Sequence, residues 1–82
     1  MKHKFKIFWI VKDEPHLLVR ILIALRKYGI SPFIIKTQEL NSNERTKISM
    51  RVHSNSSDIG VAIKKVKRLV AVIDVQYAYE KY

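Results

Sequence analysis

Three histidines are the side chains of this sequence best suited to bind a metal ion. His3, His16 and His53 are widely separated, and the chain contains no cysteine to accompany them. Structural metal sites draw their ligands from histidines and cysteines at short, regular spacings. The spacing therefore predicts three surface histidines and no metal site.

Acidic and hydroxyl side chains are the other candidates for chemistry, but no neighbour marks any of them for catalysis. A serine nucleophile needs an oriented base beside it, and no serine here has one at a recognisable spacing. Asp13 and Glu14 are adjacent at the start of an apolar segment, where acidic residues cap helices. Gly29 and Gly60 are the only glycines, too few for a phosphate-binding loop. We therefore predict that the chain is not an enzyme by itself and carries no catalytic residue and no cofactor.

A basic excess is the main feature of the composition. Sixteen Lys and Arg residues against seven Asp and Glu residues give a formal charge of +9. This excess can indicate a polyanionic partner, but the basic residues are spread along the chain, as in a lysine-rich solvated surface. The absence of cysteine favours a reducing, cytoplasmic setting. No targeting segment is recognisable, and no apolar run approaches the roughly 20 residues of a membrane span.

Four strands are predicted, three of them from side chains that alternate with a period of two. They cover residues 4–12, 33–40, 46–53 and 73–80, and all contain branched or aromatic side chains. The segment from Asn41 to Glu44 has the composition of a tight turn and joins the second and third strands into a hairpin.

Two further segments have the period of a helix. The first opens at Asp13 and Pro15 and ends at Gly29, which can adopt a left-handed stop. The second follows a serine-rich loop and has Asp58 in its first turn. The predicted core stripes are Leu18, Ile21, Leu22 and Leu25 in the first helix and Ile59, Ile63, Val66 and Val70 in the second.

The first helix has a second apolar side, made of Leu17, Val19, Ile23 and Ala24. A helix that is apolar nearly all round is usually buried on more than one side. We therefore expect an oligomer or a partner against this helix. The alternative is a few scattered apolar residues in water, which are common on protein surfaces.

The elements follow the order β-α-β-β-α-β. Right-handed crossovers convert this order into a ferredoxin-like α+β domain. The domain spans residues 1–82, with one four-stranded antiparallel sheet and both helices on one face.

RNA-recognition domains share this element order and stack bases on aromatic residues of the open sheet face. The third strand here contains no aromatic residue and no glycine of the usual signature. Nucleic acid is therefore not expected as the main partner, although one aromatic residue and several cations are predicted on the open face: Phe8, Lys4, Lys6, Lys47 and Arg51.

Two stretches at the ends of the first helix resemble the opening of an ACT domain. Residues 12–18 are similar to the strand-to-helix loop of that family, and residues 25–30 are similar to its step from helix to strand through glycine. Residues 66–75 resemble the end of the acetolactate synthase small subunit. The length resembles the short, single-domain type of that subunit.

The resemblance implies a non-catalytic subunit that activates a large catalytic subunit of branched-chain amino-acid biosynthesis. That partner would hold thiamine diphosphate, Mg²⁺ and FAD, with none on this chain. The resemblance also implies a homodimer with an amino-acid effector bound near the loop. By residue, the implied effector site is Asp13, Glu14, Pro15, His16, Leu17 and Ser31.

Three positions depart from the pattern of valine-sensing small subunits. Those proteins have asparagine at the positions of Asp13 and Ser31 and glycine at the position of His16. A histidine side chain would crowd the ligand and Asp13 would repel its carboxylate, so we predict weak or absent valine feedback. The alternative function is a stand-alone amino-acid-sensing ACT domain with another partner.

Overall fold

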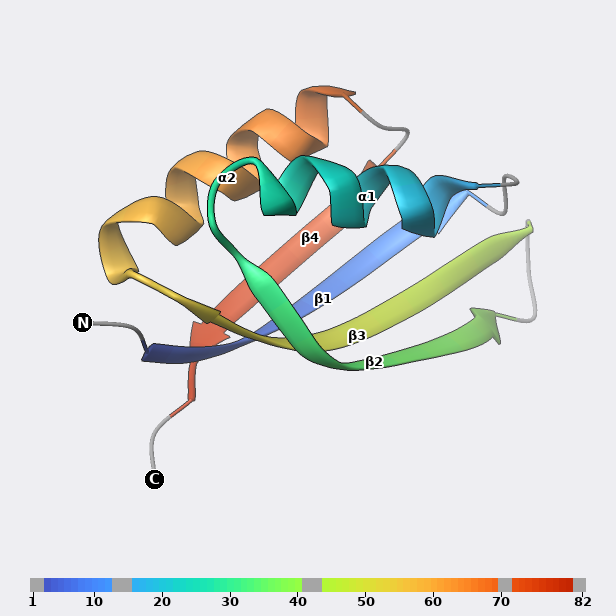
Figure 1. The fold of residues 1–82 in the computed structure, drawn as a ribbon. Helices are drawn as coiled ribbons and strands as arrows, with labels where there is room; N and C mark the ends of the chain where they lie inside the picture. Colours follow the sequence, from blue (N-terminus) through green and yellow to red (C-terminus); the bar gives the residue numbers. More distant parts are fainter. Residues whose placement is uncertain (1–2, 13–15, 41–43, 70–71, 81–82) are drawn as a thin grey trace.

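The structure is a computed structural model and describes residues 3–12, 16–40, 44–69 and 72–80. Six elements follow one another in the predicted order (Figure 1). They are β1 (His3–Lys12), α1 (Leu17–Arg26), β2 (Ser31–Leu40), β3 (Arg45–Ser54), α2 (Ser56–Leu69) and β4 (Val72–Tyr79).

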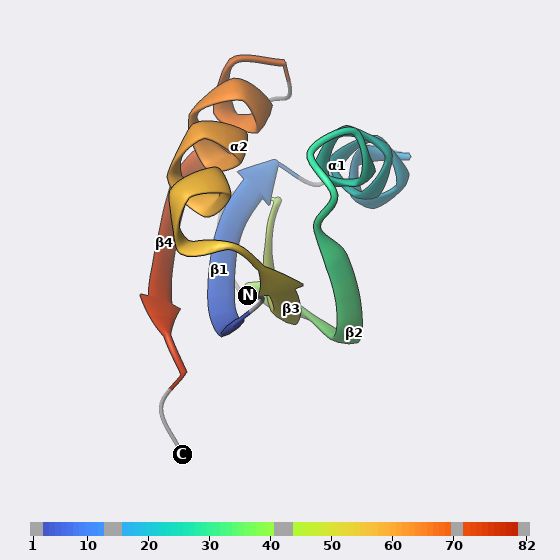
Figure 2. The same cartoon turned by 60° about the vertical axis from the view of Figure 1, so that its left-hand side comes forward.

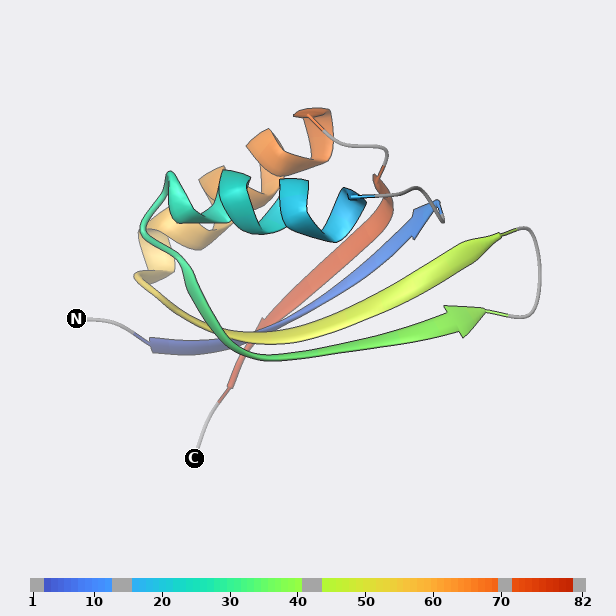
Figure 3. The same ribbon diagram turned by 45° about the vertical axis from the view of Figure 1, so that its right-hand side comes forward.

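All neighbouring strands of the single sheet are antiparallel, in the order β2-β3-β1-β4. Both helices lie on one face, and none of the described elements covers the other face (Figures 1 and 3). The predicted fold class is therefore confirmed. Each predicted strand is present with bounds shifted by one or two residues, the largest change being the start of β2 at Ser31 instead of Phe33.

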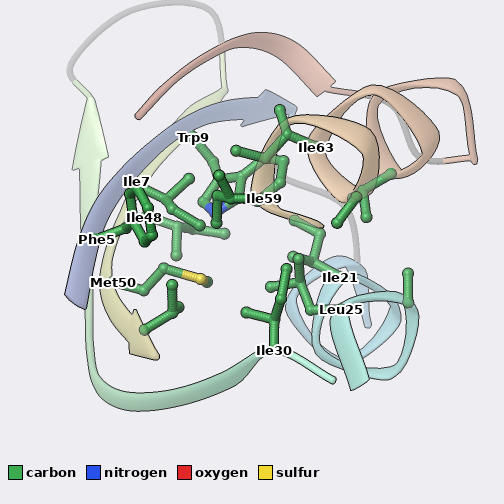
Figure 4. Close-up of a cluster of buried hydrophobic side chains, with 14 of the residues drawn as sticks. Phe5, Ile7, Trp9, Ile21, Leu25, Ile30, Ile48, Met50, Ile59 and Ile63 are labelled. Carbon is green, nitrogen blue, oxygen red and sulfur yellow. The ribbon is translucent and has the colours of Figure 1, made fainter. Parts of the chain in front are cut away.

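The core lies between the sheet and the two helices (Figure 4). Every second residue of β1 points into it, from Phe5 to Val11, because successive side chains of a strand face opposite sides. Trp9 is completely buried, and its Nε1 donor has no hydrogen-bond partner within the described ranges. A buried donor left without a partner costs about 1–3 kcal/mol.

Helix α1 is rotated relative to its predicted orientation. Leu17 and Ala24 are buried in the core, whereas Leu18 and Leu22 are only partly buried at its margin. The predicted stripe was wrong at these positions, because a helix that is apolar nearly all round leaves its rotation undetermined. The observed core stripe is Leu17, Ile21, Ala24 and Leu25.

The ends of α1 differ in how well the sequence predicted them. The helix begins at Leu17, with His16 as N-cap, and the predicted role of Pro15 lies outside the described residues. Capping by Asp13 falls outside the described residues. The stop at Gly29 is confirmed, since its φ is 72° and the amide of Ile30 donates to the carbonyl of Leu25 over 3.2 Å.

Helix α2 lies on the same face of the sheet as α1 and packs against β4. The Asn55 carbonyl accepts from the amides of Asp58 and Ile59, and the Asn55 side chain donates to the Asp58 carboxylate over 3.2 Å. These bonds satisfy the first turn of the helix. The buried stripe is Ile59, Ala62, Ile63 and Val66, while Val70 lies outside the described residues.

Candidate functional site

Helix α1 and the edge strand β2 lie on the side of the molecule away from α2 (Figure 2). A groove runs between them. It consists of two adjoining hollows of about 360 Å³ and 350 Å³ that share Val19. One hollow lies beside His16 and Thr37, at the start of α1. The other lies beside Ser31 and Ile35, toward the end of α1. Hollows of this size are in the range of small-ligand sites.

His16 stands at the head of the first hollow in an unusual backbone conformation. Its φ is 66°, in the left-handed region that glycine adopts without strain. Its carbonyl accepts from the amide of Arg20 over 3.0 Å, and its exposed side chain makes no capping hydrogen bond within the described ranges. Glycine is the residue that the ACT-like pattern places here. The backbone therefore keeps the conformation that suits glycine, while an imidazole occupies space beside the groove.

The first turn of α1 opens beside this hollow. Amides of a first turn have no helical partner, and together with the helix dipole they favour an anion such as a carboxylate. No acidic side chain occupies that turn. Leu17 is buried in the core and also lines the first hollow.

Ser31 lies at the opposite end of the groove. It begins β2 and is exposed, next to the last turn of α1. Since the ten residues of α1 span roughly 15 Å, His16 and Ser31 do not meet within one chain. Asp13, Glu14 and Pro15 lie outside the described residues.

An apolar strip borders the groove on its outer side. Val19 and Ile23 are 52% and 56% exposed on α1, and Ile35 is 38% exposed on β2. We call these three residues the α1–β2 strip. Apolar side chains gathered next to an unpaired strand edge are typical of an interaction surface.

Sequence reasoning found only part of this strip. The second apolar side of α1 pointed to Val19 and Ile23, and both are exposed. Ile35 was missed, although the run Phe33-Ile34-Ile35 is apolar on both faces of its strand. Such a run is a signal that both sides of an edge strand make contacts.

The described part of the chain offers neither a metal-binding cluster nor a membrane-spanning helix. Among residues 3–12, 16–40, 44–69 and 72–80, no three His, Asp or Glu side chains gather closely enough to hold a metal ion. In the same ranges neither helix has the length and apolar character needed to cross a membrane.

Sequence comparison identifies no relative of the chain: no protein-family model and no curated protein matches it. Solved structures do resemble it. A homoserine dehydrogenase from Thiobacillus denitrificans aligns with a TM-score of 0.83 and 18% identity over 99% of this chain. The chain spans only 18% of the length of that dehydrogenase.

Two regulatory structures align over nearly the same length of this chain. The ACT domain of the GTP pyrophosphokinase of Chlorobium tepidum matches with a TM-score of 0.76 and 11% identity, over 95% of this chain and all of that domain. The regulatory subunit of aspartate kinase from Thermus thermophilus matches with a TM-score of 0.74 and 17% identity, over 93% of this chain and 50% of the subunit. These likenesses establish the ferredoxin-like fold of ACT domains for this chain.

Proposed function

We propose that the chain is a non-catalytic regulatory domain that acts as a homodimer and binds a small amino acid. The observation that carries this proposal is the α1–β2 strip beside an open groove and an unpaired strand edge. A lone domain gains nothing from exposing three large apolar residues there, whereas a second copy would bury them.

The edge of β2 suits a symmetric partner. Two copies related by a two-fold axis can pair their β2 strands antiparallel, which extends the sheet across both chains. This pairing brings Val19, Ile23 and Ile35 of one copy against the same surface of the other. Burial of apolar area stabilises by about 25 cal/mol per Å², so the strip favours association.

The same pairing would complete the effector site. Antiparallel β2 strands place the Ser31 end of one strand beside the Leu40 end of the other. The hollow beside Thr37 lies near the Leu40 end of β2, and His16 lines the same hollow. Residues that are separated in one chain would then meet across the interface, with first-turn amides for the carboxylate of an amino acid.

The finer proposal is that this domain is the small subunit of acetolactate synthase. It is supported by the resemblance of residues 66–75 to the end of that subunit. In this role the chain would activate a large subunit that holds thiamine diphosphate, Mg²⁺ and FAD. His16 takes the position of a glycine at the groove, so valine feedback would be weak or absent.

The test is the acetolactate synthase activity of the large subunit from the same organism, measured with and without this chain. We expect a several-fold rise that saturates at a fixed ratio of subunits, with little further change on adding valine. No rise and no co-elution of the two subunits would refute the acetolactate synthase assignment.

The second candidate is a stand-alone amino-acid sensor with a different partner. The groove itself favours this candidate, because a second copy of the chain would complete the groove without any other partner. Calorimetric titration with the proteinogenic amino acids separates the two. Tight binding of one amino acid without activation of the large subunit would support the sensor, and a monomer by light scattering would refute both candidates.

A further inference from the structure

In the described ranges no helix or strand covers the sheet face opposite the helices (Figure 1). This face is strongly basic. Strand register places seven cations on it: Lys4, Lys6, Lys12, Lys36, Arg45, Lys47 and Arg51. Two acidic side chains, Asp74 and Glu80, lie at its β4 margin. Glu80 forms an ion pair with Arg51 at 3.1 Å.

Two aromatic rings lie among these cations. The Nζ atom of Lys47 is 5.1 Å from the ring centre of Phe8, and that of Lys4 is 5.7 Å from the ring centre of Phe33. Phe33 also stacks on His53, with 4.6 Å between ring centres and 28° between the planes. The sequence predicted the first ring on this face but not the second.

A β-bulge explains why the second ring was missed. The register between β2 and β3 shifts between Pro32 and Ile34, so Phe33 is an extra residue. Ile34 lies opposite Arg51 and Phe33 lies on His53. Consecutive residues therefore share one face, which a regular strand forbids.

The two rings are arranged along β1. Phe33 lies beside Lys4, and Phe8 is four residues further on, which is roughly 13 Å along a strand. Between them is a hollow lined by Phe8, Ile34, Ser49 and the cations Lys6 and Arg51. The face thus carries two separated rings, the half-buried Phe8 and the exposed Phe33, with cations between them.

We propose that this open sheet face binds single-stranded RNA. Unpaired bases stack on exposed rings while cations contact the phosphates, a mode that needs no loop or helix to enter a groove. The Ser49 hydroxyl in the hollow can both donate to and accept from a ribose 2′-hydroxyl. A second copy is a poor occupant, since two faces of the same positive sign repel.

The binding test uses fluorescence anisotropy with a labelled, unstructured RNA of roughly 12 nucleotides, within the site sizes of other small single-strand-binding domains. We expect saturable binding whose logarithmic salt dependence has a slope steeper than about −2 between roughly 50 and 200 mM salt. DNA of the same sequence and duplex RNA should bind more weakly. No binding at low salt, or equal or tighter binding of either competitor, would overturn the proposal.

Charge variants distinguish the contribution of this sheet face to RNA binding from that of the net charge of the protein. Lys6→Gln with Lys36→Gln removes two cations from the face, and Lys64→Gln with Lys65→Gln removes two from the outer side of α2. The first pair should weaken RNA binding at least tenfold and flatten the salt slope by about 1.4. The second pair should change affinity less than twofold. Equal losses in both pairs would refute a site on the sheet.

Ring variants test stacking without changing charge. Phe33→Leu, at a half-exposed position, should cost about tenfold in affinity. Its circular dichroism spectrum and melting temperature should match those of the wild type. Unchanged RNA affinity in this folded variant would overturn the stacking role. A change in oligomeric state with the Lys6→Gln, Lys36→Gln pair, without RNA binding, would assign the face to a protein partner instead.

Discussion

The two helices cover the same sheet but present different outer surfaces. Helix α1 exposes Val19 and Ile23 next to an open groove. Helix α2 exposes a row of cations on its outer side. It packs closely on β4, since a Cβ added to Gly60 would lie 3.2 Å from the Tyr77 hydroxyl. The outward row of α2 is Lys64, Lys65, Lys67 and Arg68.

This difference indicates where the domain is complete on its own. The outer side of α2 is mainly charged, with Val61 as the one exposed apolar residue among those described on this helix, and its inner side is buried. The α1 half has an equally buried inner side, but its outer side has the composition of an interface core. Regulation by association would therefore act through α1 and β2.

Core truncations give the largest expected effect and test whether both halves are equally well packed. Ile21→Ala in α1 and Ile59→Ala in α2 each remove a fully buried side chain. We expect each to lower the free energy of unfolding by about 2–5 kcal/mol, measured by urea denaturation. A much smaller loss for Ile21→Ala would mean that the groove also loosens the core beneath α1.

Lysine substitutions on the two outer surfaces test the proposed interface. Ile35→Lys places a charge in the α1–β2 strip, whereas Val61→Lys places the same charge on α2, at a position that is 52% exposed. Ile35→Lys should raise the dissociation constant of the dimer by roughly 30-fold or more, as measured by analytical ultracentrifugation. Val61→Lys should leave the dimer intact. Dissociation of the dimer by Val61→Lys but not by Ile35→Lys would place the interface on α2 and refute the proposed one.

The two glycines test the backbone of each half. Gly29→Ala forces an alanine to a φ of 72° and should cost about 1–2 kcal/mol. In Gly60→Ala the methyl group meets only the Tyr77 hydroxyl, the end of an exposed side chain that can move. Its better helix propensity should then stabilise the domain by up to about 1 kcal/mol. Thermal unfolding should show shifts of opposite sign.

Replacement of His16 has the smallest expected effect on stability. His16→Gly relieves the left-handed strain and should raise the free energy of unfolding by about 0.5–1 kcal/mol. It also removes the imidazole from the groove, so calorimetry should detect stronger valine binding than in the wild type. His16→Asn is the matched control, since asparagine tolerates this conformation but keeps a side chain there. Equal valine affinity in both variants would refute crowding as the cause of weak feedback.

Alternation and turn chemistry were sufficient to predict the architecture. In β1 and β3 one face is buried and the other is mainly polar, with Phe8 and Ile10 as the exceptions in β1, so the period of two was clear and the register followed from it. Helix α1 was harder, because Leu17 and Leu18 are chemically alike and only contact with the sheet decides which is inside. Core contacts therefore override a pattern that is apolar all round.

The candidate site was only partly predictable for a different reason. The left-handed backbone at His16 is rare for a residue other than glycine, so only the resemblance hinted at it. The separation of His16 from Ser31 depends on the length and direction of α1 in space. The bulge that turns Phe33 onto the open face has no marker in the sequence, since regular alternation predicts the opposite side.

The isolated indole of Trp9 has a spectroscopic consequence. It is the only tryptophan of the chain, it is fully buried, and no partner for its N–H lies within the described ranges. Its fluorescence should therefore be that of an indole in an apolar solvent and shift to the red when the core opens. Because Phe8, its neighbour in the chain, points to the other face of the sheet, a ligand on that face should leave the emission maximum unchanged while the fold is intact. The protein thus carries a built-in fluorophore that reports unfolding separately from binding.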